Sequence, residues 1–363
     1  MNSMRILAIV PATFDTSPGQ RFRLEQWEPI LLQHGITITW SPFEDESLHA
    51  VMGRSGNTFT KISGILKGFS RRFADVRRAK DFDAIYIFRE AALLGPAFFE
   101  RILASTGVPM VFDFDDAVWV RYVSPAHGYL SYLKMPQKTD RIIRQCARVM
   151  AGNQYLADYA DQINSHITIV PTTIDTDKYR LLDGMKKQNE VPVIGWSGSF
   201  STVQHLDTLR NALQQLAKDV RFKLRVIGTS AYELPGVEVE ALPWRATSEV
   251  EDLSGFDIGI MPLPDEDWTR GKCGLKALQY MALGIPTVCS PVGVNSEIIQ
   301  DGVNGILAAS DDEWVSKLKQ LLADAGLRTR LGEAGKQAVI KKYSAKAIAP
   351  KVAAMFQSLI RSD

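Results

Sequence analysis

The chain has 363 residues, of which 45% are hydrophobic, and it carries a formal net charge of +1. This length predicts two domains, and the apolar content suffices for two ordinary hydrophobic cores. A net charge this close to zero excludes a protein that binds nucleic acid through its overall charge, so any charge-driven partner must meet a local patch.

The first half of the chain alternates short apolar runs with helical patterns. A helix over residues 27–34 is expected to stop near Gly35, between the first two apolar runs. Alternation of this kind is typical of a parallel, doubly wound sheet. The runs predicted as strands cover residues 5–11, 36–40, 84–88, 109–114, 148–151 and 167–170.

The same pattern starts again at residue 191, after a stretch without strong periodicity over residues 171–190. We therefore expect an α/β chain with one Rossmann-like domain over 1–180 and another over 181–345. The two doubly wound parallel sheets would face each other across a cleft, where open α/β sheets bind ligands. A last helix within 346–363 can pack on either domain, including a return to the first. Strands are predicted over 191–195, 222–227, 237–242, 256–261 and 286–290, and helices over 203–218, 312–323 and 327–342.

The C-terminal half carries the strongest candidate site, directly after one of these strands. Gly271 and Gly274 leave backbone amides open at the start of a helix, an arrangement that attracts phosphate. Lys272 and Lys276 lie four residues apart, hence on one helix face, and would add positive charge beside a diphosphate. Gln279, about one turn further, can bond a ribose hydroxyl. The alternative is an ordinary glycine-containing turn with a solvated lysine pair.

The residues around this site resemble the donor-site signature of retaining glycosyltransferase family 4 (glycosyl transferases group 1), which has the GT-B fold. Residues 280–286, Tyr-Met-Ala-Leu-Gly-Ile-Pro, match the tail of that signature, and Gly274 matches its glycine. Gly271 and Gln279 stand where the family has two glutamates. Three acids just upstream are candidates to replace the first glutamate: Asp265, Glu266 and Asp267. Further similar segments are 169–175, 257–264, 290–293 and 297–305.

The resemblance implies transfer of a sugar, with retention, from a nucleoside-diphosphate donor to a hydroxyl acceptor, without a metal or other cofactor. The family's arginine and lysine after the first C-terminal strand are absent, because Gly-Trp-Ser-Gly-Ser stands at 195–199. We expect the lysine pair to bind phosphate instead. The predicted donor-binding residues are Gly19, Trp196, Ser197, Lys272, Cys273, Gly274, Leu275, Lys276 and Gln279.

A second motif, residues 17–23, follows the first predicted strand. In the family, a glycine-containing loop at this place closes over the donor phosphates and the reacting carbon, and Gly19 fits that glycine. Arg21 or Arg23 would stabilise the leaving phosphate by its charge. We assign the catalytic role to Arg21 and a contact with the acceptor to Arg23. The alternative is a plain strand–helix loop with surface arginines.

Three carboxylates, Asp113, Asp115 and Asp116, end a predicted strand, where buried charge is costly without a purpose. In the glycosyltransferase interpretation, Asp115 or Asp116 orients the acceptor hydroxyl or takes its proton, while Asp113 and His127 contact the acceptor. A second interpretation is a DxD metal motif that begins at Asp113. A third is a haloacid-dehalogenase-like phosphatase with Asp113 as nucleophile, and a fourth is a helix-capping cluster.

Residues 54–80 carry eight basic residues against one acid, with apolar residues at spacings of three and four. Such a basic amphipathic helix can lie on an anionic membrane surface, or its apolar face can pack on the sheet. No apolar run approaches the ~18 residues of a membrane span. Three cysteines without metal-site spacing indicate a reduced, cytoplasmic protein: Cys146, Cys273 and Cys289.

Together these patterns predict a cytoplasmic glycosyltransferase of bacterial surface glycan synthesis, peripheral on the inner face of the membrane. Its expected partners are a nucleotide-sugar donor and a glycan or lipid-linked acceptor, with no nucleic acid. A sugar-nucleotide-binding protein without catalysis is the first alternative, because both signature glutamates are missing. The phosphatase that would use Asp113 is the second.

Overall fold

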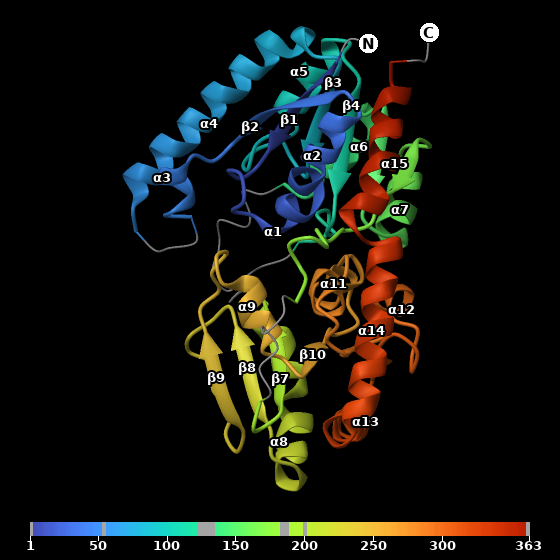
Figure 1. Ribbon diagram of the computed structural model, residues 1–363. Coiled ribbons are helices and arrows are strands. Elements are labelled where there is room, and N and C mark those ends of the chain that lie inside the picture. Colours follow the sequence, from blue (N-terminus) through green and yellow to red (C-terminus); the bar gives the residue numbers. More distant parts are fainter. Residues whose placement is uncertain (1–2, 53–55, 122–134, 182–188, 199–201, 361–363) are drawn as a thin grey trace. The chain divides into compact units, whose positions relative to one another are not determined.

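The computed structural model describes residues 3–52, 56–121, 135–181, 189–198 and 202–360 (Figure 1). Packing divides the chain into two units. Unit 1 combines Met1–Thr172 with Ala345–Asp363, and unit 2 is Thr173–Ser344. The chain therefore leaves unit 1 once, completes unit 2, and returns.

Unit 1 is built on a six-stranded sheet of order β2-β1-β3-β4-β5-β6, in which all neighbouring strands are parallel. Every residue of β3 and β4 is buried, as expected for central strands that are covered on both faces. The strands are β1 Met4–Val10, β2 Ile36–Pro42, β3 Ala84–Phe88, β4 Met110–Phe114, β5 Arg148–Ala151 and β6 Ile167–Ile169.

The last helix of the chain, α15, completes the core of unit 1. Its residues Ile348, Val352 and Phe356 pack in one buried cluster with Trp27 and Leu31 of α2 and with side chains of β1 and β3. The helices are α1 Pro18–Gln20, α2 Gln26–Gln33, α3 Glu46–His49, α4 Thr58–Arg78, α5 Phe98–Ser105, α6 Lys138–Gln145, α7 Gln154–Asp161 and α15 Ala345–Ser358, with short helical turns at Arg21–Glu25 and Ala79–Asp81.

Unit 2 repeats the design with the strand order β12-β11-β10-β7-β8-β9, again all parallel. Its core includes Trp196 of β7, Leu213 of α8 and Trp314 of α13. The strands are β7 Val193–Ser197, β8 Lys223–Ile227, β9 Glu238–Leu242, β10 Ile258–Met261, β11 Thr287–Cys289 and β12 Ile306–Leu307. The helices are α8 Arg210–Asp219, α9 Glu249–Ser254, α10 Asp267–Arg270, α11 Leu275–Ala282, α12 Asn295–Ile298, α13 Asp311–Ala323 and α14 Ala325–Lys342, with a 3₁₀ turn at Val203–Leu209.

The predicted α/β class with two parallel, Rossmann-like sheets is confirmed, whereas the cleft between them stays a prediction. The edge strand β12, of two residues, was not predicted because it is too short to show a pattern. Helices α13 and α14 begin one and two residues earlier than expected. Ser310 and Asp324 cap them by accepting hydrogen bonds from the backbone N–H of Glu313 and Leu327. Among the described residues, no helix is both long and apolar enough to cross a bilayer.

Candidate functional site

The candidate phosphate site of unit 2 is built on the start of α11, next to the end of β7. Gly274 is the residue before the helix and has φ +71°, a left-handed conformation that favours glycine. A Cβ at this position would also collide with the side chain of Ile298. Both the positive φ and the contact with Ile298 therefore require glycine at this position. Gly274 fixes the direction of the helix start, where backbone N–H groups favour anions.

Two lysines and a histidine surround this helix start. The Lys276 Nζ lies 5.1 Å from the ring centroid of Trp196 at the end of β7, and the Lys272 Nζ lies 4.8 Å from that of Trp268. His205 is 4% exposed, and its Nε2 has no hydrogen-bond partner among the described residues. Unit 2 thus combines two cations and a buried imidazole at one helix start.

The two lysines also act on the histidine. Burial, followed by the positive charges of Lys276 and Lys272, lowers the pKa of His205 to about 4 from its ordinary value of 6.5. The imidazole is therefore neutral at pH 7, and one ring nitrogen can donate a hydrogen bond while the other accepts one. A buried, neutral hydrogen-bonding group beside two cations suits an anionic ligand that carries oxygen atoms.

This lowered pKa makes the stability of the protein depend on pH. In the unfolded chain His205 binds a proton below pH 6.5, whereas in the folded chain it does so only below about pH 4. Between these two pH values the unfolded state therefore holds more protons than the folded state. Stability is expected to be complete above this window and to fall as pH decreases through it. Urea denaturation should show a smaller loss for His205→Gln than for the wild type. Equal losses in both proteins would contradict the assigned environment.

Gln279 does not occupy the position predicted for it. Its side chain is buried, and its Nε2 donates to Glu249 Oε1 at 2.9 Å and to the Tyr179 hydroxyl at 3.3 Å. Tyr179 donates in turn to Glu249 Oε2 at 2.6 Å, and Trp244 donates to Oε1 at 3.1 Å. The expected bond to a ribose hydroxyl is therefore corrected: the amide nitrogen of Gln279 joins Tyr179 and Trp244 in donating to the buried carboxylate of Glu249.

The remaining predicted donor residues of unit 2 frame the helix start. The backbone N–H of Ser197 donates to the buried Tyr280 hydroxyl at 2.8 Å, which ties the end of β7 to α11. Cys273 is buried and Leu275 is half-buried. Asp265, a candidate replacement for a signature glutamate, forms an exposed ion pair with Arg270 at 2.7 Å.

In unit 1, two of the predicted catalytic residues share one arginine at the carboxyl ends of β3 and β4. Arg89 Nε donates to Asp115 Oδ1 at 2.7 Å, and its NH2 donates to Asp116 Oδ2 at 2.7 Å. Arg89 adopts φ +61°, an uncommon conformation for a residue with a side chain. Gly19 lies against the cluster, since a Cβ there would come within 2.7 Å of Asp115 Oδ2. The structure thus brings Gly19, Asp115 and Asp116 together around Arg89.

Arg23 and Asp113 are paired with each other inside unit 1, and both are fully buried. Arg23 NH2 lies 2.6 Å from Asp113 Oδ1, its Nε donates to Oδ2 at 2.7 Å, and its NH1 donates to the carbonyl of Val170 at 2.8 Å. Tyr86 also donates to Asp113. Burial alone would lower the pKa of Arg23, but the adjacent carboxylate outweighs it and raises that pKa.

The acceptor contact predicted for Arg23 and Asp113 is therefore corrected, because side chains without exposed area cannot touch an acceptor. The same pairing argues against Asp113 as a phosphatase nucleophile or as a metal ligand. Within the ranges that the structure describes, no group of three or more His, Cys, Asp or Glu side chains could hold a metal ion.

Arg21 lies apart from that pair, in the turn that follows the first loop. It is largely buried, with its NH1 3.6 Å from Asp15 Oδ1 and its guanidinium 4.7 Å from the ring centroid of Phe22. Gln20 ties this loop to α1, because its side chain exchanges hydrogen bonds with the backbone of Ala12. The remaining predicted acceptor residue, His127, lies outside the described residues.

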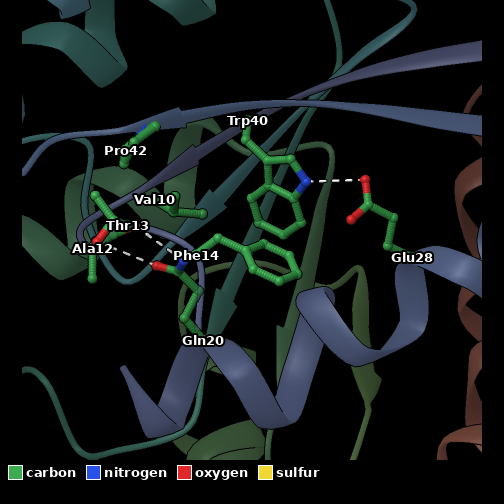
Figure 2. A pocket seen from close by; sticks show the side chains of 8 residues that line it. All are labelled: Val10, Ala12, Thr13, Phe14, Gln20, Glu28, Trp40 and Pro42. Atoms are coloured by element: carbon green, nitrogen blue, oxygen red, sulfur yellow. Dashed lines mark hydrogen bonds between the residues drawn. The ribbon is translucent and has the colours of Figure 1, made fainter. Parts of the chain in front are cut away.

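A shallow pocket of about 400 Å³ lies at the carboxyl ends of β1 and β2. Figure 2 shows Phe14 beside Trp40, and the two rings meet edge to face at 5.7 Å. On the other side of the indole, Trp40 Nε1 donates to Glu28 Oε1 at 3.0 Å. The lining is mostly apolar, with Thr13, Gln20 and Glu28 as its polar residues.

Sequence reasoning missed Arg89 as a site residue and did not include His205 among the predicted donor-binding residues. Arg89 directly follows the apolar run of β3, so its place at a strand end was the available signal. The commitment of Gln279 to Glu249 had no such signal, because 30 residues separate them in the chain.

Comparison with known proteins points to one family. Residues 191–324 match the family described as Glycosyl transferases group 1. An uncharacterized glycosyltransferase of Methanocaldococcus jannaschii is 33% identical over 40% of this chain and 42% of its own length. The N-acetyl-alpha-D-glucosaminyl L-malate synthase of Bacillus anthracis is 29% identical over 25% and 24%. An uncharacterized 41.2 kDa protein in the cps region of Klebsiella pneumoniae is 23% identical over 48% and 51%. The chain thus spans about half or less of the length of these relatives.

Solved structures resemble the whole chain. Sucrose-phosphate synthase from Thermosynechococcus elongatus matches with a TM-score of 0.73 at 14% identity, over 99% of this chain and all of the other. Anabaena HepE, solved in complex with UDP-glucose, matches with a TM-score of 0.70 at 14% identity, over 98% of this chain and all of the other. At this level of identity the likeness shows a shared fold.

Proposed function

We propose, from the membership of residues 191–324 in the glycosyl transferases group 1 family and from the GT-B fold of the chain, that the protein transfers a sugar from a nucleoside-diphosphate donor to a hydroxyl acceptor. The observation that carries the proposal is the cationic helix start of unit 2. There Lys272, Lys276 and the neutral His205 surround Gly274. HepE, a structural neighbour, is solved with UDP-glucose.

In this proposal the diphosphate of the donor sits at the start of α11. The two lysines and the helix amides offset its charge and stabilise the additional negative charge that the leaving diphosphate acquires. These groups supply the positive charge that a divalent cation would otherwise provide, so the reaction needs no metal. His205 donates a hydrogen bond to a phosphate oxygen. We expect retention at the anomeric carbon, as the family resemblance implies.

The acceptor is proposed to bind unit 1, at the cluster of Arg89, Asp115 and Asp116. The guanidinium keeps both carboxylates oriented through charge-assisted hydrogen bonds. One carboxylate then accepts a hydrogen bond from the acceptor hydroxyl and receives its proton as the glycosidic bond forms. The pocket beside Trp40 and Phe14 would hold a further part of the acceptor, since ligand pockets are mostly apolar with few polar groups.

The biological role is proposed from the relatives. One of them is described as a protein in the cps region of Klebsiella pneumoniae. We propose that the chain acts in bacterial surface glycan synthesis, on the cytoplasmic side of the membrane and in peripheral contact with it, with a glycan or lipid-linked acceptor.

A panel of nucleoside-diphosphate sugars tests the donor side by calorimetry, and radiolabelled sugar transfer tests the reaction. We expect one or a few donors to bind and to be consumed with acceptor extract, also in the presence of a chelator. A donor that binds without any product would favour the non-catalytic alternative, which the replacement of both signature glutamates motivates. Hydrolysis of phosphomonoesters by the wild type, without any sugar transfer, would instead favour the phosphatase.

A further inference from the structure

Helix α4 of unit 1 turns an unusual side toward the protein. The residues that it buries are Gly64, Gly68, Arg72 and Asp75, so its inner face holds two glycines and an ion pair. A Cβ on Gly64 would lie 2.8 Å from the Cβ of Leu48, and one on Gly68 would lie 2.7 Å from the Phe43 ring. The backbone of α4 therefore packs directly on the side chains of Leu48 and Phe43, with no side chain of its own between them.

The buried charges of this inner face are fully used within unit 1. Arg72 NH1 lies 2.9 Å from Asp75 Oδ2 and 3.0 Å from Ser41 Oγ, and its NH2 donates to the carbonyl of Val10 at 2.9 Å. Burial lowers the pKa of Arg72 to about 10, although the Asp75 charge opposes that shift. Close contact, the ion pair and the ring contacts of Phe69 with Phe43 and Phe99 hold α4 in place, whereas four other apolar side chains of α4 are exposed.

Those apolar residues point outward. Phe59 is 86% exposed, Ile62 54%, Leu66 62% and Phe73 47%. Spacings of three, four and seven residues place all four on one face of the helix. Phe98 of α5 extends this surface, since it is 41% exposed and its ring centroid lies 6.4 Å from that of Phe73. We call these five side chains the α4–α5 stripe.

A shallow groove of about 240 Å³ adjoins the stripe where α4 and α5 meet. Besides Phe73 and Phe98, Phe69 and Phe99 line it, and its other lining residues are Leu94, Gly95 and Pro96. The lining contains no charged side chain. An exposed apolar stripe that continues into an apolar groove marks an interaction surface.

The charges around the stripe are mostly positive. Lys67, Arg77 and Lys80 on and after α4, and Arg101 of α5, have exposed side chains. The acid that meets one of them is Asp45, whose Oδ2 lies 3.8 Å from the Lys67 Nζ. Apolar side chains flanked by cations are the composition of helices that lie in the interface of an anionic bilayer. In Figure 1 α4 runs along the outside of unit 1 beside α3 and α5, so its long axis can lie flat on a surface.

We propose that the α4–α5 stripe docks on an anionic lipid surface, with α4 parallel to the bilayer plane and its phenylalanines among the acyl chains. A second copy of the chain fits the stripe less well, because symmetric pairing would bring the same cations together. The proposal identifies the surface through which the proposed transferase would reach a lipid-linked acceptor. It rests on the proposed function only for that purpose, since lipid binding requires neither donor nor turnover.

The test is sedimentation of the full chain with vesicles of phosphatidylglycerol and phosphatidylcholine, compared with vesicles of phosphatidylcholine alone. The wild type is expected to bind the anionic vesicles and to be released by salt. The triple variant Phe59→Ser/Ile62→Ser/Leu66→Ser should bind the anionic vesicles more weakly by a factor of at least about ten. The double variant Lys67→Glu/Arg77→Glu should lose binding to the anionic vesicles and should bind vesicles of phosphatidylcholine alone as the wild type does. Circular dichroism should match the wild type for both variants, because the replaced side chains are exposed.

A matched control removes three exposed apolar side chains elsewhere: Leu32→Ser, Val303→Ser and Ile340→Ser. This control should bind vesicles as the wild type does. Binding that survives the α4 triple variant, or a wild type that stays in solution, would overturn the proposal. Concentration-dependent dimerisation that the triple variant abolishes, without vesicle binding, would assign the stripe to a second copy instead. Donor calorimetry on the same proteins, without vesicles, reports separately on the proposed function.

Discussion

Lys276→Ala is expected to weaken the binding of nucleoside diphosphates and their sugars by about 10- to 100-fold, and to leave the bare nucleoside almost unaffected. A hydrogen bond to a charged group is worth about 1.5–3 kcal/mol, which corresponds to that range. The Nζ of Lys276 is held over the Trp196 ring, beside the helix start at Gly274. Its charge therefore acts on phosphate and not on the base. Calorimetry with UDP, UDP-glucose and uridine measures the difference.

Lys317→Ala serves as the matched control. Lys317 is a half-buried lysine on α13 of the same unit, so its removal changes the net charge equally without altering the start of α11. It should bind all three ligands like the wild type. If Lys276→Ala weakens the binding of uridine as much as the binding of UDP, the lysine supports the pocket as a whole and has no phosphate-specific role.

Arg23→Met is expected to destabilise unit 1 by about 3–5 kcal/mol, because it leaves the Asp113 carboxylate buried without its cation. Both side chains have no exposed area, and Arg23 contacts Asp113 through two of its nitrogen atoms. Hydrogen exchange gives a local readout. The amides of β4 should exchange about 150- to 5,000-fold faster, in proportion to that loss of free energy, while those of β7 in unit 2 keep their wild-type rates.

The double variant Arg23→Met/Asp113→Leu separates the charge effect from lost packing. Replacing both members of a buried ion pair by apolar residues of similar size is often neutral. We therefore expect β4 protection to recover most of its wild-type value. If Arg23→Met alone leaves the hydrogen-exchange protection of β4 unchanged, Asp113 finds another partner or takes up a proton at little cost.

Except for β12, the strands of both units could be predicted because each contains a short run rich in apolar residues. The residues of β3 and β4 are buried on both faces, so their apolar runs are continuous. Helix starts were harder to predict. The first turn of α13 is acidic and that of α14 begins with Ala325 and Gly326, and their capping residues, Ser310 and Asp324, lie outside the apolar pattern.

Site residues could be predicted where chemistry follows local order along the chain. Gly274, Lys272 and Lys276 are neighbours in sequence, and the structure gathers them at one helix start. Arg23 and Asp113 are 90 residues apart, so their pairing, which removes both from the predicted acceptor contact, has no local signature.

Helix α4 shows a related limit of sequence patterns. Its periodicity identifies an amphipathic helix, but the period does not state which face meets the protein. The close packing of Gly64 and Gly68 on unit 1 decides that, and it leaves Phe59, Ile62 and Leu66 on the outside.

The return of the chain to unit 1 has a consequence for synthesis on the ribosome. Unit 2 is one continuous stretch, Thr173–Ser344, and the backbone N–H of Ile174 near its beginning donates to the carbonyl of Tyr343 near its end. Unit 1 needs Ile348, Val352 and Phe356 for its core, and these are translated only after the whole of unit 2. The half that is made first therefore waits, with part of its interior uncovered, until α15 emerges from the exit tunnel, whereas the half made second can close as soon as its own stretch is complete.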